Sequence, residues 1–440
     1  MRLLARLYPT IRVAGPDPEP WQELARKVNP AVELTDGGCD YALSIGDDAP
    51  AVAPVTFHLG SEGWDARFST RNPQSLGDSP NPLGAGAAAC LGAAAIFRAA
   101  FLEQSVDDAD VAFSTLALEA VRSPEQPSLD SLEIPPETVL LGLGAVGNGA
   151  LWAIGRAGVG GTLQLIDPEP LDAGNLQRYV LAVPGEEGRA KVELARDFLG
   201  ERLDGRSHRL AWAEFLERVG RRWSRVLVAL DSAADRRAAQ AALPRWIANA
   251  WTQPGDLGVS VHPWRKGACL TCLYLPQRGT PNEDQLVSAA MGFEDEAHLR
   301  QVRELLATGT PPSRQLLQES AAALGIDPEP VLAYAERPLR EFYSEGICGG
   351  AAVPLDRVGV PERSVHVPLV HQSALAGILL ASRLFADLLG LGSDTAQATR
   401  IDLMRPLHEH LTRPVAKDER EICICQDQVY VAAYDELWDG

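Results

Sequence analysis

The first third of the chain alternates short apolar runs with clusters of glycine, aspartate and proline. The runs Tyr41–Ile45, Val55–Leu59 and Asp65–Ser69 have the length and flanking residues of strands joined by turns. A stretch of small apolar residues, Leu83–Leu102, then predicts a buried helix. Residues 1–134 are therefore expected to form a smaller α/β domain of their own.

From Glu137 onward the apolar pattern changes to alternating strands and helices. That rhythm is typical of a parallel, doubly wound Rossmann-like sheet. The expected strands are Thr138–Gly142, Thr162–Asp167 and Arg225–Asp231, and the expected helices are Asn148–Ala157, Lys191–Leu199 and Ala233–Leu243.

The second domain, residues 135–440, contains one stretch without strand signals. Residues 283–344 have helical periodicity throughout and predict a helical insertion. A glycine-rich bend follows it, and then comes an apolar helix over His366–Leu389. Two late strands, Arg400–Met404 and Gln428–Ala433, are expected to close the chain.

A glycine loop stands between the first strand and the first helix of the second domain. Gly142, Gly144 and Gly147 have the G-x-G-x-x-G spacing that lets a tight turn approach a phosphate at a helix N-terminus. Asp167 lies 20 residues after Gly147, at the end of the next strand, where a carboxylate binds ribose hydroxyls. The loop predicts nucleotide binding, and the residues that follow decide which nucleotide.

Polar and cationic residues near this loop favour a triphosphate over a dinucleotide. Asn175 and Arg178 can hydrogen-bond an α-phosphate, and Lys191 can supply a point charge to the outer phosphates. Asp231 adds a carboxylate where Mg²⁺ would bind. A nicotinamide-dependent dehydrogenase has no use for Arg178, Lys191 and Asp231 in this order.

Charge and composition narrow the classes of partner and compartment. The 440 residues include 40 basic and 59 acidic side chains, a net charge of −19 that repels nucleic acid. Only four of the basic residues are lysines, so a lysine at a motif position is less likely to be there by chance. The most apolar stretch, Leu83–Phe97, is shorter than the about 20 residues of a membrane span. A cytoplasmic protein without a membrane partner is expected.

These residues resemble a known family. The stretch from about Glu137 to Tyr430 is similar to the ThiF / ubiquitin-activating enzyme superfamily, whose glycine loop, aspartate-ended strand, Asn-Leu-x-Arg-Gln segment, lysine and later aspartate appear in the same order. Tyr179 stands where the family usually has Gln, and Glu169 replaces a second Asp. The resemblance implies adenylation with ATP, with Asp167 on the ribose and Asp231 on Mg²⁺. Asn175, Arg178 and Lys191 would hold the phosphates.

The resemblance also implies features that the pattern alone does not. Residues 1–134 would be a degenerate, inactive adenylation-like half. An arginine from that half or from a partner subunit would complete the site, with Arg2, Arg6 and Arg12 as candidates. Paired adenylation domains would make the protein a homodimer.

The seven cysteines divide into three groups. Cys269 and Cys272 form a CxxC pair, and Cys423 and Cys425 form a CxC pair, which together predict a structural Zn²⁺ site. Two core cysteine pairs or a redox pair are the alternatives. Cys39 and Cys90 are expected to pack in the first domain.

Cys348 lies among glycines that leave room for a peptide tail. By the resemblance, it belongs to a crossover loop, residues 345–364, and attacks the acyl-adenylate to give a thioester. Cys348, Arg178 and Asp231 are thus the expected catalytic residues.

The predicted function is activation of a ubiquitin-like protein through its C-terminal glycine, followed by transfer from Cys348 to a conjugating enzyme. The small first domain, the helical insertion and the Cys-Gly-Gly loop resemble activating enzymes of bacterial ubiquitin-like conjugation operons linked to phage defence. The alternative within the same fold is a sulfur-carrier adenylyltransferase of thiamine or molybdopterin synthesis. A catalytically inactive scaffold is a third possibility.

Overall fold

The computed structural model describes residues 1–47, 53–102, 110–123, 125–253, 256–275, 283–347, 369–405 and 411–439. The chain forms two compact units, residues 1–275 with 368–440, and residues 276–367. The predicted 345–364 loop and Cys348 lie outside the described residues, apart from 345–347.

The main sheet of the first unit is parallel on one side and antiparallel on the other. Its strand order is β10-β9-β8-β11-β12-β13-β14-β15, with β7 beside β9. Strands β10 to β12 in this order pair in parallel, and β13 to β15 are added antiparallel. The strands are β7 (Glu133–Ile134), β8 (Thr138–Leu141), β9 (Gly160–Ile166), β10 (Leu203–His208), β11 (Arg225–Val228), β12 (Trp246–Gln253), β13 (Asp256–Pro263), β14 (Gln397–Ile401) and β15 (Leu411–Pro414).

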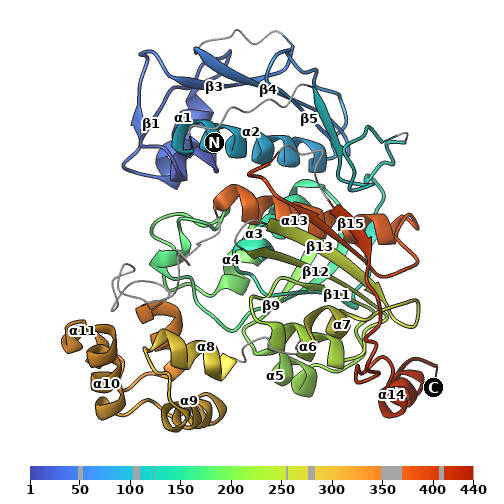
Figure 1. The fold of residues 1–440 in the computed structure, drawn as a ribbon. Helices are drawn as coiled ribbons and strands as arrows, with labels where there is room; N and C mark the ends of the chain where they lie inside the picture. Colours follow the sequence, from blue (N-terminus) through green and yellow to red (C-terminus); the bar gives the residue numbers. More distant parts are fainter. Residues whose placement is uncertain are drawn as a thin grey trace. The chain divides into compact units, whose positions relative to one another are not determined.

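Helices cover both faces of this sheet (Figure 1). Side chains alternate along each strand, so Leu140 of β8 packs on one face while Val139 and Leu141 pack on the other. The helices on the Leu140 face are α3 (Ala145–Arg156), α4 (Lys191–Phe198) and α13 (Val370–Leu388). The opposite face is covered by α5 (Trp212–Arg218), α6 (Ala233–Ala241) and α7 (Leu270–Tyr274). The predicted doubly wound α/β fold is confirmed.

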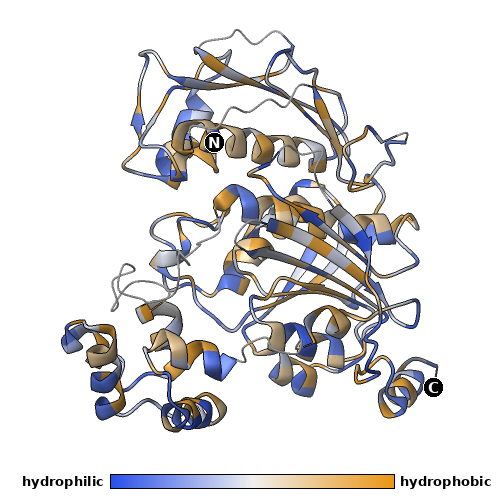
Figure 2. Ribbon diagram, viewed as in Figure 1, coloured by the Kyte–Doolittle hydropathy of each residue, from blue (hydrophilic) through white to orange (hydrophobic). Residues whose placement is uncertain are grey.

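The N-terminal part of the same unit has its own sheet of order β3-β4-β5-β6. The helix α2 (Leu83–Phe101) packs on β4 and β5 and also on α13, and Figure 2 shows it as a mostly apolar ribbon. It is long and apolar enough to cross a membrane, but 72 % of its apolar window is buried, as in a core helix. The remaining elements are η1 (Leu4–Arg6), β1 (Thr10–Ile11), α1 (Glu19–Val28), β2 (Glu33–Leu34), β3 (Tyr41–Ile45), β4 (Val55–Glu62), β5 (Asp65–Ser69) and β6 (Val111–Ser114).

The second unit is helical over its described residues and has a separate core. Asp295 and Ser313 cap two helix N-termini with their side chains, and Gly309 and Gly325 end the same helices in the left-handed conformation. The helices are α8 (Glu283–Ala290), α9 (Glu296–Thr308), α10 (Arg314–Leu324), α11 (Pro328–Leu332), α12 (Leu339–Glu341) and the π-helix η3 (Phe342–Ile347).

One sequence prediction is wrong. Residues 428–433 belong to a helix, α14 (Gln428–Asp439), and not to a strand. Its valines and tyrosines give a short apolar run that a strand and one face of a helix share. The helix is held by tertiary contacts: Trp438 donates to the Leu243 carbonyl at 2.8 Å, and Tyr434 stacks on Trp264.

Helices α3 and α13 approach each other closely enough to require glycine. A Cβ on Gly377 of α13 would lie 2.2 Å from the Val146 carbonyl oxygen and 2.3 Å from the Ala150 nitrogen of α3. Both obstacles are backbone atoms, so the added carbon cannot be relieved by a side-chain rotation. This packing fixes α3, the helix that starts at the glycine loop.

We therefore expect Gly377→Ala to lower the free energy of unfolding by about 3 kcal/mol, the upper range for overpacked cores. Chemical denaturation measures the change. Gly200→Ala is the matched control, because a Cβ there meets nothing within 4 Å. Equal stability of the two variants would contradict the close helix contact.

Candidate nucleotide site

The glycine loop lies at the point where the strand order of the sheet reverses. Strand β8 is flanked by β9 on one side and by β11 on the other, because the chain runs from β8 to β9 and β10 and then crosses to β11. In open α/β sheets, ligands bind in the crevice outside the carboxyl ends of the strands at this point. The loop follows β8, and Asp231 follows β11, so the topology brings both to this edge.

Each glycine of the loop has a distinct structural role. Gly142 has φ +88°, and a Cβ on it would lie 2.7 Å from the Ala229 carbonyl oxygen. A Cβ on Gly147 would lie 2.2 Å from the Gly142 oxygen, which keeps helix and strand close. The space above Gly144 is open except for the Tyr179 hydroxyl at 3.5 Å. Gly144 caps α3, so the open side is also the helix N-terminus.

Asp167 is tied to the loop by its carboxylate. Its two oxygens accept hydrogen bonds from the backbone nitrogens of Leu143, at 2.8 Å, and Glu169, at 2.9 Å. The side chain is 6 % exposed, and this burial raises the pKa of Asp167, an effect that the charge of Lys191 opposes. A carboxylate has further lone pairs, so these bonds leave acceptors for ribose hydroxyls.

Lys191 brings a buried positive charge to the same place. The Lys191 side chain is 6 % exposed, and its ammonium donates to the carboxylate of Glu169 at 2.5 Å. The Glu169 side chain is 67 % exposed. Burial alone would lower the pKa of Lys191, but the charges of Asp167 and Tyr179 and the bond to Glu169 raise it above its usual value. The lysine is therefore charged at neutral pH. An incoming phosphate can replace the exposed Glu169 carboxylate as its partner.

Arg178 lies beside these groups, although its guanidinium is bonded elsewhere. The ring of Tyr179 lies 5.5 Å from the Lys191 nitrogen and 5.8 Å from the Arg178 guanidinium carbon. Arg178 donates to the Gly174 carbonyl at 2.9 Å, one residue from Asn175.

Asn175 is used as a cap for the turn η2 (Ala173–Asn175). Its side-chain oxygen accepts from the Asp172 backbone nitrogen at 3.1 Å. These bonds leave the amide N–H groups of Asn175 and the other guanidinium N–H groups of Arg178 as donors to a phosphate. Asp231 is exposed at the end of the β11 segment and offers a carboxylate to a cation.

Three contributors to the site were not assigned roles there by the sequence. Glu169 is the partner of Lys191, and Tyr179 covers Gly144 and contacts both cations. Asn148 donates to the Leu143 carbonyl at 2.9 Å and accepts from the Leu181 nitrogen at 3.3 Å. The sequence feature that could have indicated this role is the position of Asn148 directly after Gly147. The bond to Leu181 joins the glycine loop to the segment after Arg178.

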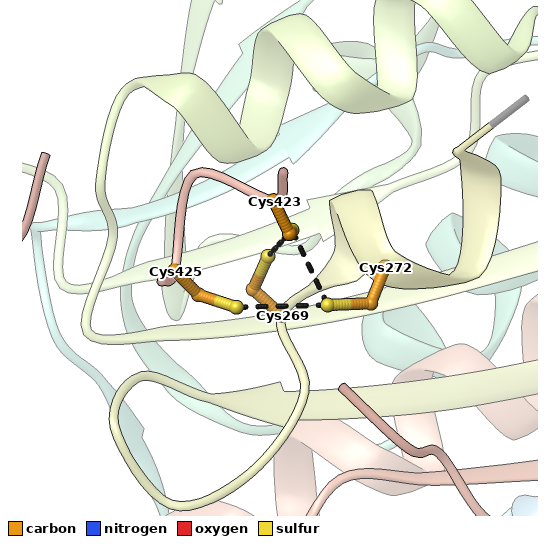
Figure 3. Close-up of side chains that lie close together, drawn as sticks. All are labelled: Cys269, Cys272, Cys423 and Cys425. Carbon is orange, nitrogen blue, oxygen red and sulfur yellow. Dashed lines mark hydrogen bonds between the residues drawn. The ribbon is translucent and has the colours of Figure 1, made fainter. Parts of the chain in front are cut away.

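The four predicted metal-binding cysteines meet at one place, as Figure 3 shows. The Sγ atoms of Cys269, Cys272, Cys423 and Cys425 all lie within 4.8 Å of one another. Three of the Sγ–Sγ distances are 3.2, 3.4 and 3.5 Å. A tetrahedral Zn²⁺ with bonds of about 2.3 Å separates its ligands by about 3.8 Å. The cluster fits a Zn²⁺ site.

Comparisons with known proteins identify two segments. The ThiF family model matches residues 115–419, and the model of Prokaryotic E2 family C matches residues 1–102. These matches leave untested the prediction that residues 1–134 are an inactive adenylation-like half.

Two curated relatives are similar in sequence. The y4jF protein of Sinorhizobium fredii is 41 % identical over 450 residues, covering 99 % of this chain and 86 % of the relative. The sulfur carrier protein ThiS adenylyltransferase of Escherichia coli is 30 % identical over 178 residues, covering 38 % of this chain and 67 % of the relative.

Among solved structures, E. coli MccB with ATP is similar, with a TM-score of 0.41, 12 % identity and coverage of 68 % and 67 % of the two chains. The structure of PaaA has a TM-score of 0.36, 13 % identity and coverage of 66 % of each chain. The chain belongs to the ThiF family and has its adenylyltransferase fold, and its residues 1–102 match the model of Prokaryotic E2 family C.

Proposed function

We propose that the protein uses ATP and Mg²⁺ to adenylate the C-terminal glycine of a ubiquitin-like protein. The observation that carries the proposal is the buried Lys191 ammonium, held by an exposed carboxylate beside an open helix N-terminus. A carboxylate is a poor acyl donor. Attack of its oxygen on the α-phosphorus forms an acyl-adenylate and releases pyrophosphate.

Each predicted residue has a task in this step. Gly142, Gly144 and Gly147 let the backbone N–H groups at the start of α3 face a phosphate. Asp167 holds the ribose, and Asp231 offers its carboxylate to Mg²⁺, which neutralises phosphate charge when bound. Asn175, Arg178 and Lys191 stabilise the charge that builds on the phosphates as pyrophosphate leaves.

The second step is transfer to a thiol. The Cys348 thiolate attacks the acyl carbon, AMP leaves, and the carrier is held as a thioester for a conjugating enzyme. The match of residues 1–102 to Prokaryotic E2 family C favours this route, because E2 is the name given to conjugating enzymes. The homodimer, the cytoplasmic location and the role in phage defence stay predictions.

The test is ATP–pyrophosphate exchange in the presence of small proteins that end in glycine. We expect exchange with the cognate carrier and none when its terminal carboxylate is amidated, because the amide cannot attack the phosphate. Exchange that is absent with every carrier, or equal with the amidated form, would contradict the proposal.

Replacing the proposed nucleophile separates the two steps. We expect Cys348→Ala to abolish a thiol-sensitive adduct with the carrier while exchange stays within about threefold of wild type, since the nucleotide site keeps its charges. Gel shift and peptide mapping measure the adduct. Cys39→Ala is the control and should keep an adduct at Cys348. An undiminished adduct in Cys348→Ala would exclude this nucleophile.

A second candidate function is adenylation of a sulfur carrier. The 30 % identity to the ThiS adenylyltransferase over 178 residues favours it. On that route the activated carrier becomes a thiocarboxylate and no conjugating enzyme follows. Mass spectrometry of the carrier distinguishes the two, since a thiocarboxylate stays on the released carrier while the thioester to the enzyme is cleaved when an added thiol attacks its acyl carbon.

A further inference from the structure

Two arginines near the N-terminus bind the segment that follows Arg178. Arg6 donates from Nε to the Leu176 carbonyl at 2.8 Å and from a second guanidinium nitrogen to the Ala182 carbonyl. Arg2 donates to the carbonyls of Val180, at 3.1 Å, and Leu181, at 3.2 Å. Four carbonyls of one segment, residues 176–182, thus accept bonds from side chains 170 or more positions away.

The end of that segment is also fixed by apolar packing. Val183 is 8 % exposed and lies in a small hydrophobic cluster whose other buried members all come from the first 32 residues. They are Ala5, Ile11, Ala25, Val28 and Val32. The arginines themselves are anchored there, because Asn29 donates to the Ala5 carbonyl at 2.9 Å and holds η1 against the end of α1.

One side of the segment borders a pocket. This pocket of about 230 Å³ is lined by Tyr179, Leu181 and Val183 together with Arg2 and Lys191. A segment that borders a pocket lacks dispersion contacts on that side. The hydrogen bonds to its carbonyls therefore act together with the buried side chains of the segment to hold it in place.

We propose that Arg6, supported by Arg2, is a positioning residue that holds Asn175, Arg178 and Tyr179 at the nucleotide phosphates. The inference rests on the proposed adenylation at this site. The arginine acts through backbone carbonyls and does not touch the nucleotide. The N-terminal segment, matched by a different family, thereby sets the geometry of the adenylation site.

The electrostatics support this role. Burial, and then the charge of Arg2, lower the pKa of Arg6 to about 10, so the guanidinium stays charged at neutral pH. Its fork binds carbonyls at both ends of the segment at once. Lysine keeps the charge but offers no such fork.

The test compares three variants of the full-length protein. Arg6→Met removes the fork and the charge, Arg6→Lys keeps the charge, and Arg26→Met is the control. Arg26 is an exposed arginine in the last turn of α1, in the same N-terminal region. The measurements are amide hydrogen exchange over residues 176–183 and the kcat and KM for ATP in pyrophosphate exchange.

We expect Arg6→Met to speed amide exchange over residues 176–183 about tenfold or more, which corresponds to losing charge-assisted bonds. The kcat should fall about tenfold or more, because misplaced catalytic groups act mainly on the transition state. The KM for ATP should change less than threefold, since the glycine loop and Asp167 are untouched. Arg6→Lys should recover part of the kcat, and Arg26→Met should match wild type.

Amide exchange in Arg6→Met that equals wild type would overturn the inference. So would a loosened segment with an unchanged kcat, or an equal loss in Arg26→Met. A wild-type protein without any pyrophosphate exchange would instead contradict the proposed function. In that case the amide exchange still decides whether Arg6 holds the segment.

Discussion

Lys191→Met is expected to lower the kcat of ATP–pyrophosphate exchange about 100- to 1,000-fold, the cost of removing one preorganised group that stabilises transition-state charge. The ammonium is buried, lies near Asp167 and Tyr179, and is held in place by Glu169. A desolvated charge that is already oriented interacts strongly with a phosphate and needs little reorganisation. The initial rate at saturating ATP and carrier measures the effect.

The matched control is another of the four lysines. Lys266 is 60 % exposed and pairs with Asp394 at 2.6 Å on the surface. Lys266→Met should leave kcat within about twofold, as expected for an exposed pair. Lys191→Arg, which keeps the charge, should recover part of the rate. Equal activity of Lys191→Met and Lys266→Met would remove Lys191 from the site.

Loss of one cluster cysteine is expected to have the second large effect. We expect one Zn²⁺ per chain in the purified protein and less than about a tenth of that in Cys423→Ser, since four thiolates complete the tetrahedral site. Cys423 is fully buried, and the cluster joins the α7 turn to the segment before α14. The metal would add a cross-link to the contacts of Trp438 and Tyr434 that hold the C-terminal helix.

Zinc loss should therefore destabilise α14 first. Elemental analysis measures the metal, and limited proteolysis followed by mass spectrometry should show early cleavage between residues 415 and 440 in Cys423→Ser. The control is Cys39→Ser, a half-buried cysteine outside the cluster, which should keep both the zinc and the protease resistance. A zinc content near zero in wild-type protein prepared without chelators would contradict the metal site.

The sheet and its helices could be predicted because their local signals agree with the tertiary structure. The glycine loop, the apolar strand before it and Asp167 specify one βαβ unit, and the structure has that unit at β8, α3 and β9. The small residues of α2 indicated burial on all sides, and the helix is packed between two elements. The prediction of a strand at residues 428–433 was wrong because the helix there is held by the tertiary contacts of Trp438 and Tyr434 and has no strong local signal.

The site was predictable in its residue types but not in its bonds. The spacing of Asp167 and Lys191 from the glycine loop placed both near a phosphate. Nothing in the spacing indicates that Glu169 holds the lysine or that Asn175 caps its own turn. The bonds of Arg2 and Arg6 to residues 176–182 depend on how the N-terminal segment docks, and no local pattern encodes that.

The most direct test of the account is a crystal structure of the protein with ATP and Mg²⁺. We predict the triphosphate at the start of α3, with Lys191 and Arg178 on its phosphates, Asp167 on the ribose and Asp231 on the cation. A nucleotide bound away from the crevice between β8 and β11, with Lys191 still paired to Glu169, would contradict the account.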